Sequence, residues 1–183
     1  MTSKDDQAYI EKVKRGDLAS YTYLVDKYKN MAFTIAMRIL SDSFEAEDVA
    51  QESFIKAYLQ IGSFQGKSKF STWLYTIVYR TAVSKLQQGK FKFASLDDEI
   101  GEEYAYDYSS NAIEKLQTAE REKFVKEAIQ RLPKAESVVI TLFYLSENSV
   151  EEISEITGLS ASNVKVKLFR ARKILEKELH FLL

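Results

Sequence analysis

Apolar side chains recur every three or four positions along most of this chain. Tyr21, Leu24, Val25 and Tyr28 follow the i, i+3, i+4, i+7 spacing with which one face of an α-helix meets a core. Similar stripes are present in residues 3–15, 35–40, 45–64, 74–82 and 112–179. With one proline and six glycines in the whole sequence, little interrupts these stripes. The pattern therefore predicts an all-α protein.

One stretch breaks the helical period. Residues 94–111 read ASLDDEIGEEYAYDYSSN, with six acidic side chains and no basic one. We interpret this stretch as an acidic flexible linker between two small helical domains, at 1–93 and 112–183. A second interpretation, that its negative charge lies in a basic groove, stays open.

A helix-turn-helix is expected near the C-terminus. Ser149 and Glu152 have the spacing of a capping box, Gly158 can end the first short helix, and Ser160 can cap the second. The second helix is strongly basic and begins with short polar side chains, as a helix that enters the major groove would. The candidate DNA-contacting residues on this helix are Ser162, Asn163, Lys165, Lys167, Arg170 and Arg172. Similar helix pairs also occur in proteins that never touch DNA, so charge supports this interpretation as much as the motif does.

Two further clusters of residues, both in the first half of the chain, are candidate binding surfaces. Asp48, Gln51 and Glu52 lie on the outward face of the helix in 45–64. Carboxylates at a helix start favour the positive end of its dipole, but these three extend a turn further and could bind a basic partner. After them comes a loop and helix in which aromatic and basic residues alternate, which suits stacking and backbone contacts with single-stranded nucleic acid. Its candidate residues are Lys67, Lys69, Phe70, Trp73, Tyr75 and Arg80.

The composition of the chain limits which other classes of protein it can belong to. The net charge of this 183-residue chain is −1, so a nucleic-acid binder of this composition must segregate its charges. The absence of cysteine excludes disulfides and cysteine-ligated metal sites, and no apolar run is long enough to span a bilayer. We expect a cytoplasmic protein without stable membrane insertion. No P-loop, G-x-G-x-x-G or H-E-x-x-H motif occurs, so we expect no cofactor, no metal site and no enzymatic activity.

The order of these features resembles the extracytoplasmic-function (ECF) group of bacterial RNA polymerase sigma factors. The similar strings are AEDVAQESFIKAY, SFQGKSKFSTWLYTI and the stretch from LPKAES to RARKIL. The resemblance implies that Asp48, Gln51 and Glu52 bind core RNA polymerase. It further implies that residues 67–80, with Ser71 and Thr72 among them, capture and help to melt the minus-ten promoter element. The basic helix, with Ser160 at its entry, would read the minus-thirty-five element. An anti-sigma factor is the implied regulatory partner.

This chain departs from the family pattern at several positions. Arg80 and Ser84 stand where many members have Asn and Asp, while Val166 and Phe169 stand where serine and histidine are common. The promoter sequence of relatives is therefore not transferable. The rival interpretation is a stand-alone transcriptional regulator with a C-terminal helix-turn-helix, which would need neither the acidic helix nor the basic aromatic loop.

Overall fold

The computed structural model of this chain describes residues 4–94 and 118–180, and all regular structure in these ranges is helical. The elements are α1 Lys4–Lys14, α2 Leu18–Leu40, α3 Ser43–Gln60, the short 3-10 helix η1 Ile61–Ser63, α4 Phe70–Ala94, α5 Thr118–Arg131, α6 Lys134–Tyr144, α7 Val150–Thr157 and α8 Ala161–Glu178. This confirms the all-α prediction. The predicted linker falls almost wholly on 95–117, outside the described residues, and the proposed domain boundaries stay a prediction.

Side-chain caps fix several helix ends, among them the two that the sequence predicts at Ser149 and Ser160. At the start of α2, an Asp17 carboxylate oxygen accepts a hydrogen bond from the Ser20 amide at 3.3 Å. At α7, the Ser149 hydroxyl and the Glu152 carboxylate form a complete capping box. Gly158 ends α7 with φ of +74°, a left-handed conformation that costs other residues steric strain. Ser160 caps α8 through the Asn163 amide. The helix-turn-helix is therefore confirmed as α7, turn and α8.

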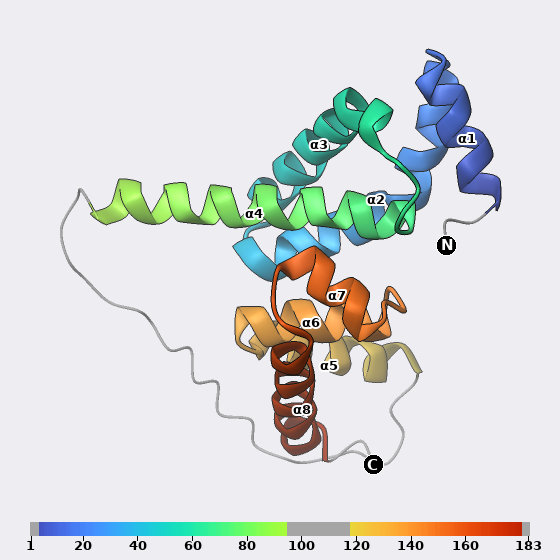
Figure 1. The fold of residues 1–183 in the computed structure, drawn as a ribbon. Helices are drawn as coiled ribbons and strands as arrows, with labels where there is room; N and C mark the ends of the chain where they lie inside the picture. Colours follow the sequence, from blue (N-terminus) through green and yellow to red (C-terminus); the bar gives the residue numbers. More distant parts are fainter. Residues whose placement is uncertain (1–3, 95–117, 181–183) are drawn as a thin grey trace.

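The first half is built around α2, α3 and α4, which pack on one another with α1 against α2 (Figure 1). Leu24, Ile35, Val49 and Leu74 are among its fully buried side chains. Asp6 attaches α1 to α2, because its carboxylate lies 2.6 Å from Lys27 Nζ and accepts a hydrogen bond from the Tyr28 hydroxyl at 2.7 Å.

The second half combines α5, α6, α7 and α8. The α6–α8 pair is its most extensive helix contact, and Val164 and Leu168 of α8 are buried. No helix in the described ranges is long and apolar enough to cross a membrane.

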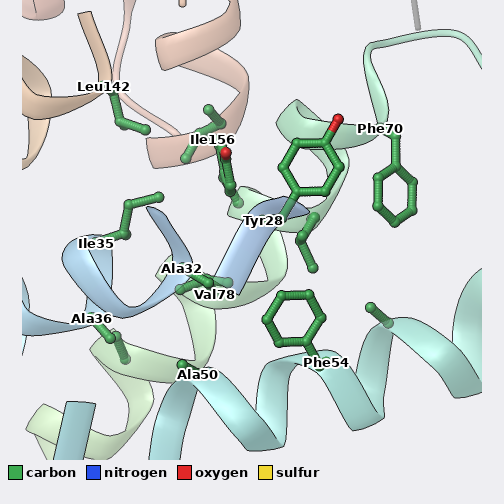
Figure 2. Close-up of a cluster of buried hydrophobic side chains, with 14 of the residues drawn as sticks. Tyr28, Ala32, Ile35, Ala36, Ala50, Phe54, Phe70, Val78, Leu142 and Ile156 are labelled. Carbon is green, nitrogen blue, oxygen red and sulfur yellow. The ribbon is translucent and has the colours of Figure 1, made fainter. Parts of the chain in front are cut away.

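The two halves pack directly on each other. Helix α7 lies against α4, and α6 lies against α2, so one buried cluster runs through both halves. Figure 2 shows Leu142 of α6 and Ile156 of α7 beside Ile35 and Tyr28 of α2. We call this contact of α6 and α7 with α2 and α4 the seam. It places the helix-turn-helix beside the segment that the sequence associates with single-stranded DNA.

Candidate nucleic-acid and protein interfaces

One face of α3 carries a mixed apolar and polar surface. Asp48, Gln51 and Glu52 are all exposed there, as the sequence predicts. On the same face, Phe44, Ile55 and Leu59 are 81%, 62% and 75% exposed. Positions 44, 48, 51, 55 and 59 are spaced by three or four residues and form one row, which we call, together with Glu52, the α3 stripe.

Sequence reasoning missed the apolar members of the α3 stripe. The signal was present, because Ile55 and Leu59 fall outside the spacing of the core positions of this helix. Exposed apolar side chains that gather in a row, rather than singly, are typical of a binding surface. Glu52 is held by an ion pair with Lys56 at 2.7 Å, and both side chains remain accessible.

The predicted minus-ten residues divide into exposed and buried positions. Lys67 and Arg80 are exposed, while Lys69, Ser71 and Trp73 are half-buried. In contrast, Phe70, Thr72 and Tyr75 are buried. Phe70 packs against Tyr28, Phe64 and Trp73, with ring centroids 5.6 Å apart in each pair. Phe70 therefore belongs to the core in this arrangement, whereas Trp73 keeps a partly accessible ring at the edge of the same cluster.

Two of these residues contact the helix-turn-helix half across the seam. Lys69 Nζ lies 3.0 Å from one carboxylate oxygen of Glu152 and 3.2 Å from the other. The buried Tyr75 is hydrogen-bonded to Ser146, in the turn before α7. Glu152 therefore has two functions: it closes the capping box of α7 and pairs with Lys69.

We expect alkaline pH to destabilise the seam through Tyr75. Burial raises the pKa of this phenol to about 12, although its hydrogen bond with Ser146 has the opposite effect. A group whose pKa is raised on folding stabilises the fold fully below its unfolded pKa of 10.0, and that stabilisation is lost as pH rises towards 12. Unfolding midpoints measured from pH 8 to 12 should fall less steeply in Tyr75→Phe than in the wild type. Identical pH profiles would contradict this assignment.

The recognition helix α8 presents fewer free cations than its sequence suggests. Lys165 and Arg170 are exposed, as are Ser160, Ser162 and Asn163 at its start. Lys167 is turned inward and lies 3.3 Å from the buried carboxylate of Glu136. Arg172 donates a hydrogen bond from Nε to the Tyr144 hydroxyl at 2.9 Å and lies over the Phe143 and Tyr144 rings.

Apolar side chains that sequence reasoning missed accompany these cations. Val166 and Phe169 are 45% and 61% exposed on α8. Apolar groups at such positions can contact the methyl group of thymine in the major groove. The outward surface of α8 therefore combines phosphate-seeking cations, short polar groups and two apolar side chains.

The different environments of Arg170 and Arg172 predict different effects on DNA binding. Arg170→Ala should weaken duplex binding and lower the slope of log K against log salt by about one unit, because one phosphate contact is lost. Arg172→Ala is the matched control, since its guanidinium is already engaged by Tyr144, and its slope should stay near that of the wild type. Titrations of a duplex fragment at several salt concentrations would measure both, and equal slopes in the two variants would contradict the assignment.

Comparison with known proteins gives the family. A model of sigma-70 region 2 matches residues 24–91, and a model of sigma-70 region 4 matches residues 125–175. The RNA polymerase sigma-H factor of Pseudomonas aeruginosa is 34% identical over 190 residues, covering 100% of this chain and 98% of the relative. The ECF RNA polymerase sigma factor SigW of Bacillus subtilis is 35% identical over 177 residues, covering 93% of this chain and 94% of the relative.

The chain belongs to the sigma-70 family, in its ECF group. As a sigma factor it binds core RNA polymerase and directs it to promoter DNA, with region 2 involved in recognition and melting of the minus-ten element. The α3 stripe and residues 67–80 lie in region 2, and the helix-turn-helix lies in region 4.

Solved structures agree on the fold. The sigma factor RpoE of Bartonella quintana, solved with the anti-sigma factor NepR, superposes with a TM-score of 0.69 at 23% identity and covers 89% of this chain and 98% of that one. CnrH, solved with the cytosolic domain of CnrY, superposes with a TM-score of 0.66 at 18% identity. The match covers 97% of this chain and 98% of that one. In residues 4–94 and 118–180, no group of three His, Cys, Asp or Glu side chains is arranged to hold a metal ion.

Proposed function

We propose that this sigma factor divides its work among three surfaces. The α3 stripe binds core polymerase, residues 67–80 hold the minus-ten element, and the outward face of α8 reads the minus-thirty-five element. The observation that carries this assignment is the α3 stripe, a row of exposed apolar and acidic side chains that the core of the protein does not use.

The composition of the α3 stripe suits a specific protein partner. Phe44, Ile55 and Leu59 supply apolar area that can be removed from water on binding. Asp48 and Glu52 add negative charge beside it, which favours a partner surface that is apolar and basic. A solvated helix face without a partner would gain nothing from three exposed apolar side chains in register.

The two proposed DNA-binding surfaces differ in chemistry. In the segment 67–80, Lys67 and Arg80 are available to phosphates, and the partly exposed Trp73 ring is available for stacking. On α8, Lys165 and Arg170 can position the helix on duplex phosphates while its polar first turn reaches base edges. The first surface suits unpaired strands and the second suits paired ones.

We also assign a partner and a place of action. RpoE was solved with the anti-sigma factor NepR and CnrH with the cytosolic domain of CnrY, so an anti-sigma factor is the expected inhibitor of this chain too. Since its targets are polymerase and DNA, we place the protein in the cytoplasm and give it no catalytic role. Its relatives are transcription initiation factors.

In vitro transcription tests the proposal directly. Purified protein, core RNA polymerase and sheared genomic DNA of the source organism should yield discrete 5′ ends that are absent without the sigma factor. Arg170→Ala should reduce these products. If initiation is unselective and unaffected by the added protein, the proposed division of surfaces is wrong.

A further inference from the structure

Helix α1 lies outside the matched part of region 2, yet it packs beside the proposed minus-ten surface. The matched residues begin at 24, whereas α1 ends at Lys14. The apolar residues Ile10 and Val13 of α1 are buried, and the helix packs on α2. It also lies beside η1, from which the chain continues into the loop before α4 (Figure 1). Polar side chains of α1 are therefore within reach of the segment that leads into residues 67–80.

The Trp73 ring is held by an aromatic cluster. It packs against Phe64 with ring centroids 5.3 Å apart and against Phe70 at 5.6 Å. Phe70 packs in turn against Tyr28 at 5.6 Å. We call Tyr28, Phe64, Phe70 and Trp73 the Trp73 cluster. Because aromatic rings in contact restrict each other's position and tilt, the orientation of the partly exposed Trp73 ring depends on where the other three rings lie.

The last turn of α1 holds Phe64. The Phe64 amide donates a hydrogen bond to the Ile61 carbonyl at 3.1 Å, and the Phe64 carbonyl accepts one from Lys14 Nζ at 3.0 Å. Glu11 lies 3.3 Å from the same ammonium group, but it belongs to α1 itself and leaves the bond to Phe64 in place. Since a loop carbonyl without a ladder partner needs a donor from elsewhere, Lys14 fixes the Phe64 backbone and, through the Phe64 ring, Trp73.

The first turn of α1 holds Tyr28. Asp6 is only 3% exposed, and its carboxylate accepts a hydrogen bond from the Tyr28 hydroxyl at 2.7 Å and pairs with Lys27 at 2.6 Å. Burial and the neighbouring Asp6 both raise the pKa of the Tyr28 phenol, so its hydroxyl keeps its proton and remains a donor. Asp6 and Lys14 lie about 12 Å apart along the helix axis. Helix α1 therefore grips the Trp73 cluster at two separate points.

We propose that Lys14 and Asp6 are positioning residues for minus-ten recognition: α1 holds the Trp73 cluster so that the Trp73 ring is oriented to stack on an unpaired base. A ring that is fixed before DNA arrives does not have to be ordered on binding, which lowers the entropic cost of the contact. The inference rests on the proposed function for the role of Trp73. That α1 sets the position of this ring is a separate claim, which the free protein can test.

Tryptophan fluorescence tests the claim about position. Trp73 is the single tryptophan of the chain, so the emission reports on this ring alone. Lys14→Met keeps the aliphatic stem but removes the donor to Phe64. Its emission should shift to longer wavelength, and acrylamide should quench it more strongly than in the wild type, because a less tightly held ring meets more water. Lys14→Arg retains a cationic donor and should restore the wild-type signal. Lys12→Met is the matched control, since it removes the same charge from α1 at a position where the ammonium lies over the Tyr9 ring.

Promoter opening tests the role of that position. With core polymerase and a promoter found by the transcription experiment above, permanganate reactivity of unpaired thymines measures melting. Lys14→Met should open this promoter about three- to tenfold less than the wild type, the lower part of the range for loss of one stacked base. Lys14→Arg and Lys12→Met should open it normally, and all three variants should bind core polymerase like the wild type. Trp73→Ala is measured beside them to show what the ring itself contributes.

The outcomes separate the inference from the proposed function. A Trp73 signal in Lys14→Met that equals the wild type would overturn the inference, even if the thermal midpoint falls, because α1 would then only stabilise the fold. The inference also fails if Trp73→Ala impairs opening and Lys14→Met does not. If Trp73→Ala itself opens the promoter normally, the role proposed for this ring in residues 67–80 is wrong, while the fluorescence still decides whether α1 positions it.

A second variant tests the other attachment. Tyr28→Phe removes the hydroxyl that Asp6 accepts from and keeps the ring that packs against Phe70. Acrylamide quenching of Trp73 should rise in this variant as well, although less than in Lys14→Met, since the effect passes through one more ring. Tyr23→Phe, which removes a hydroxyl from a neighbouring ring of α2 outside the Trp73 cluster, is the matched control. Equal quenching in these two tyrosine variants would contradict the role of Asp6.

Discussion

Reversing the charge of the α3 stripe should abolish recruitment to core polymerase. In the double variant Asp48→Lys and Glu52→Lys, two exposed carboxylates become ammonium groups, so attraction to a basic partner turns into repulsion. We expect the affinity for core polymerase to fall at least about 100-fold, a loss of about 2.7 kcal/mol. Fluorescence anisotropy of labelled sigma factor titrated with core enzyme would measure it.

The control for this variant must change charge equally elsewhere. Asp26→Lys together with Glu151→Lys reverses two exposed acidic side chains outside α3 and should leave polymerase binding within about threefold of the wild type. Both double variants should unfold within a few degrees of the wild type, since surface substitutions usually change stability by less than about 0.5 kcal/mol each. Unchanged affinity in the α3 variant would move the docking site to another surface.

Truncating Leu74 should cause a large loss of stability. Its side chain is fully buried where α4 meets the common core, and removal of three carbons leaves a cavity. Leu74→Ala should therefore cost about 2–5 kcal/mol of unfolding free energy. For a chain of this size, that lowers the thermal midpoint by about 5–15 °C.

Leu59→Ala is the matched control, because the same atoms are removed at a position that is 75% exposed. Its midpoint should stay within about 2 °C of the wild type. Its affinity for core polymerase should nevertheless fall about five- to thirtyfold if Leu59 belongs to the docking surface. Calorimetry and the anisotropy titration would separate the two effects. A Leu59→Ala variant that is destabilised but binds normally would mean that this side chain has a structural role.

The cases in which sequence reasoning succeeded share a local cause. The caps at Ser149 and Ser160 and the helix end at Gly158 depend on residues within a few positions of the backbone groups concerned. The exposed acidic and amide residues of α3 were also predictable, since a helical period separates outward from inward positions. The same period already set Ile55 and Leu59 apart from the core face, but an exposed apolar residue is only recognisable as such once the neighbouring helices are placed.

The cases in which sequence reasoning fell short depend on contacts between distant segments. Lys167 and Arg172 look like free cations along α8, yet Glu136 and Tyr144 on α6 hold them. Phe70 looks like a stacking residue in a basic loop, yet the Tyr28 ring on α2 packs against it. Spacing along one helix cannot reveal a partner some 30 or 40 residues away.

The sequence alone determined the helices, their caps, the helix-turn-helix and the family resemblance, because each follows from the order of side chains along a few turns of backbone. Only the tertiary structure decided which cations are free to meet DNA and which apolar groups form the α3 stripe. It also decided that Glu152 reaches across the seam to Lys69. The physical reason is that burial and ion pairing are set by how packed helices lie against one another, and no short stretch of sequence contains that information.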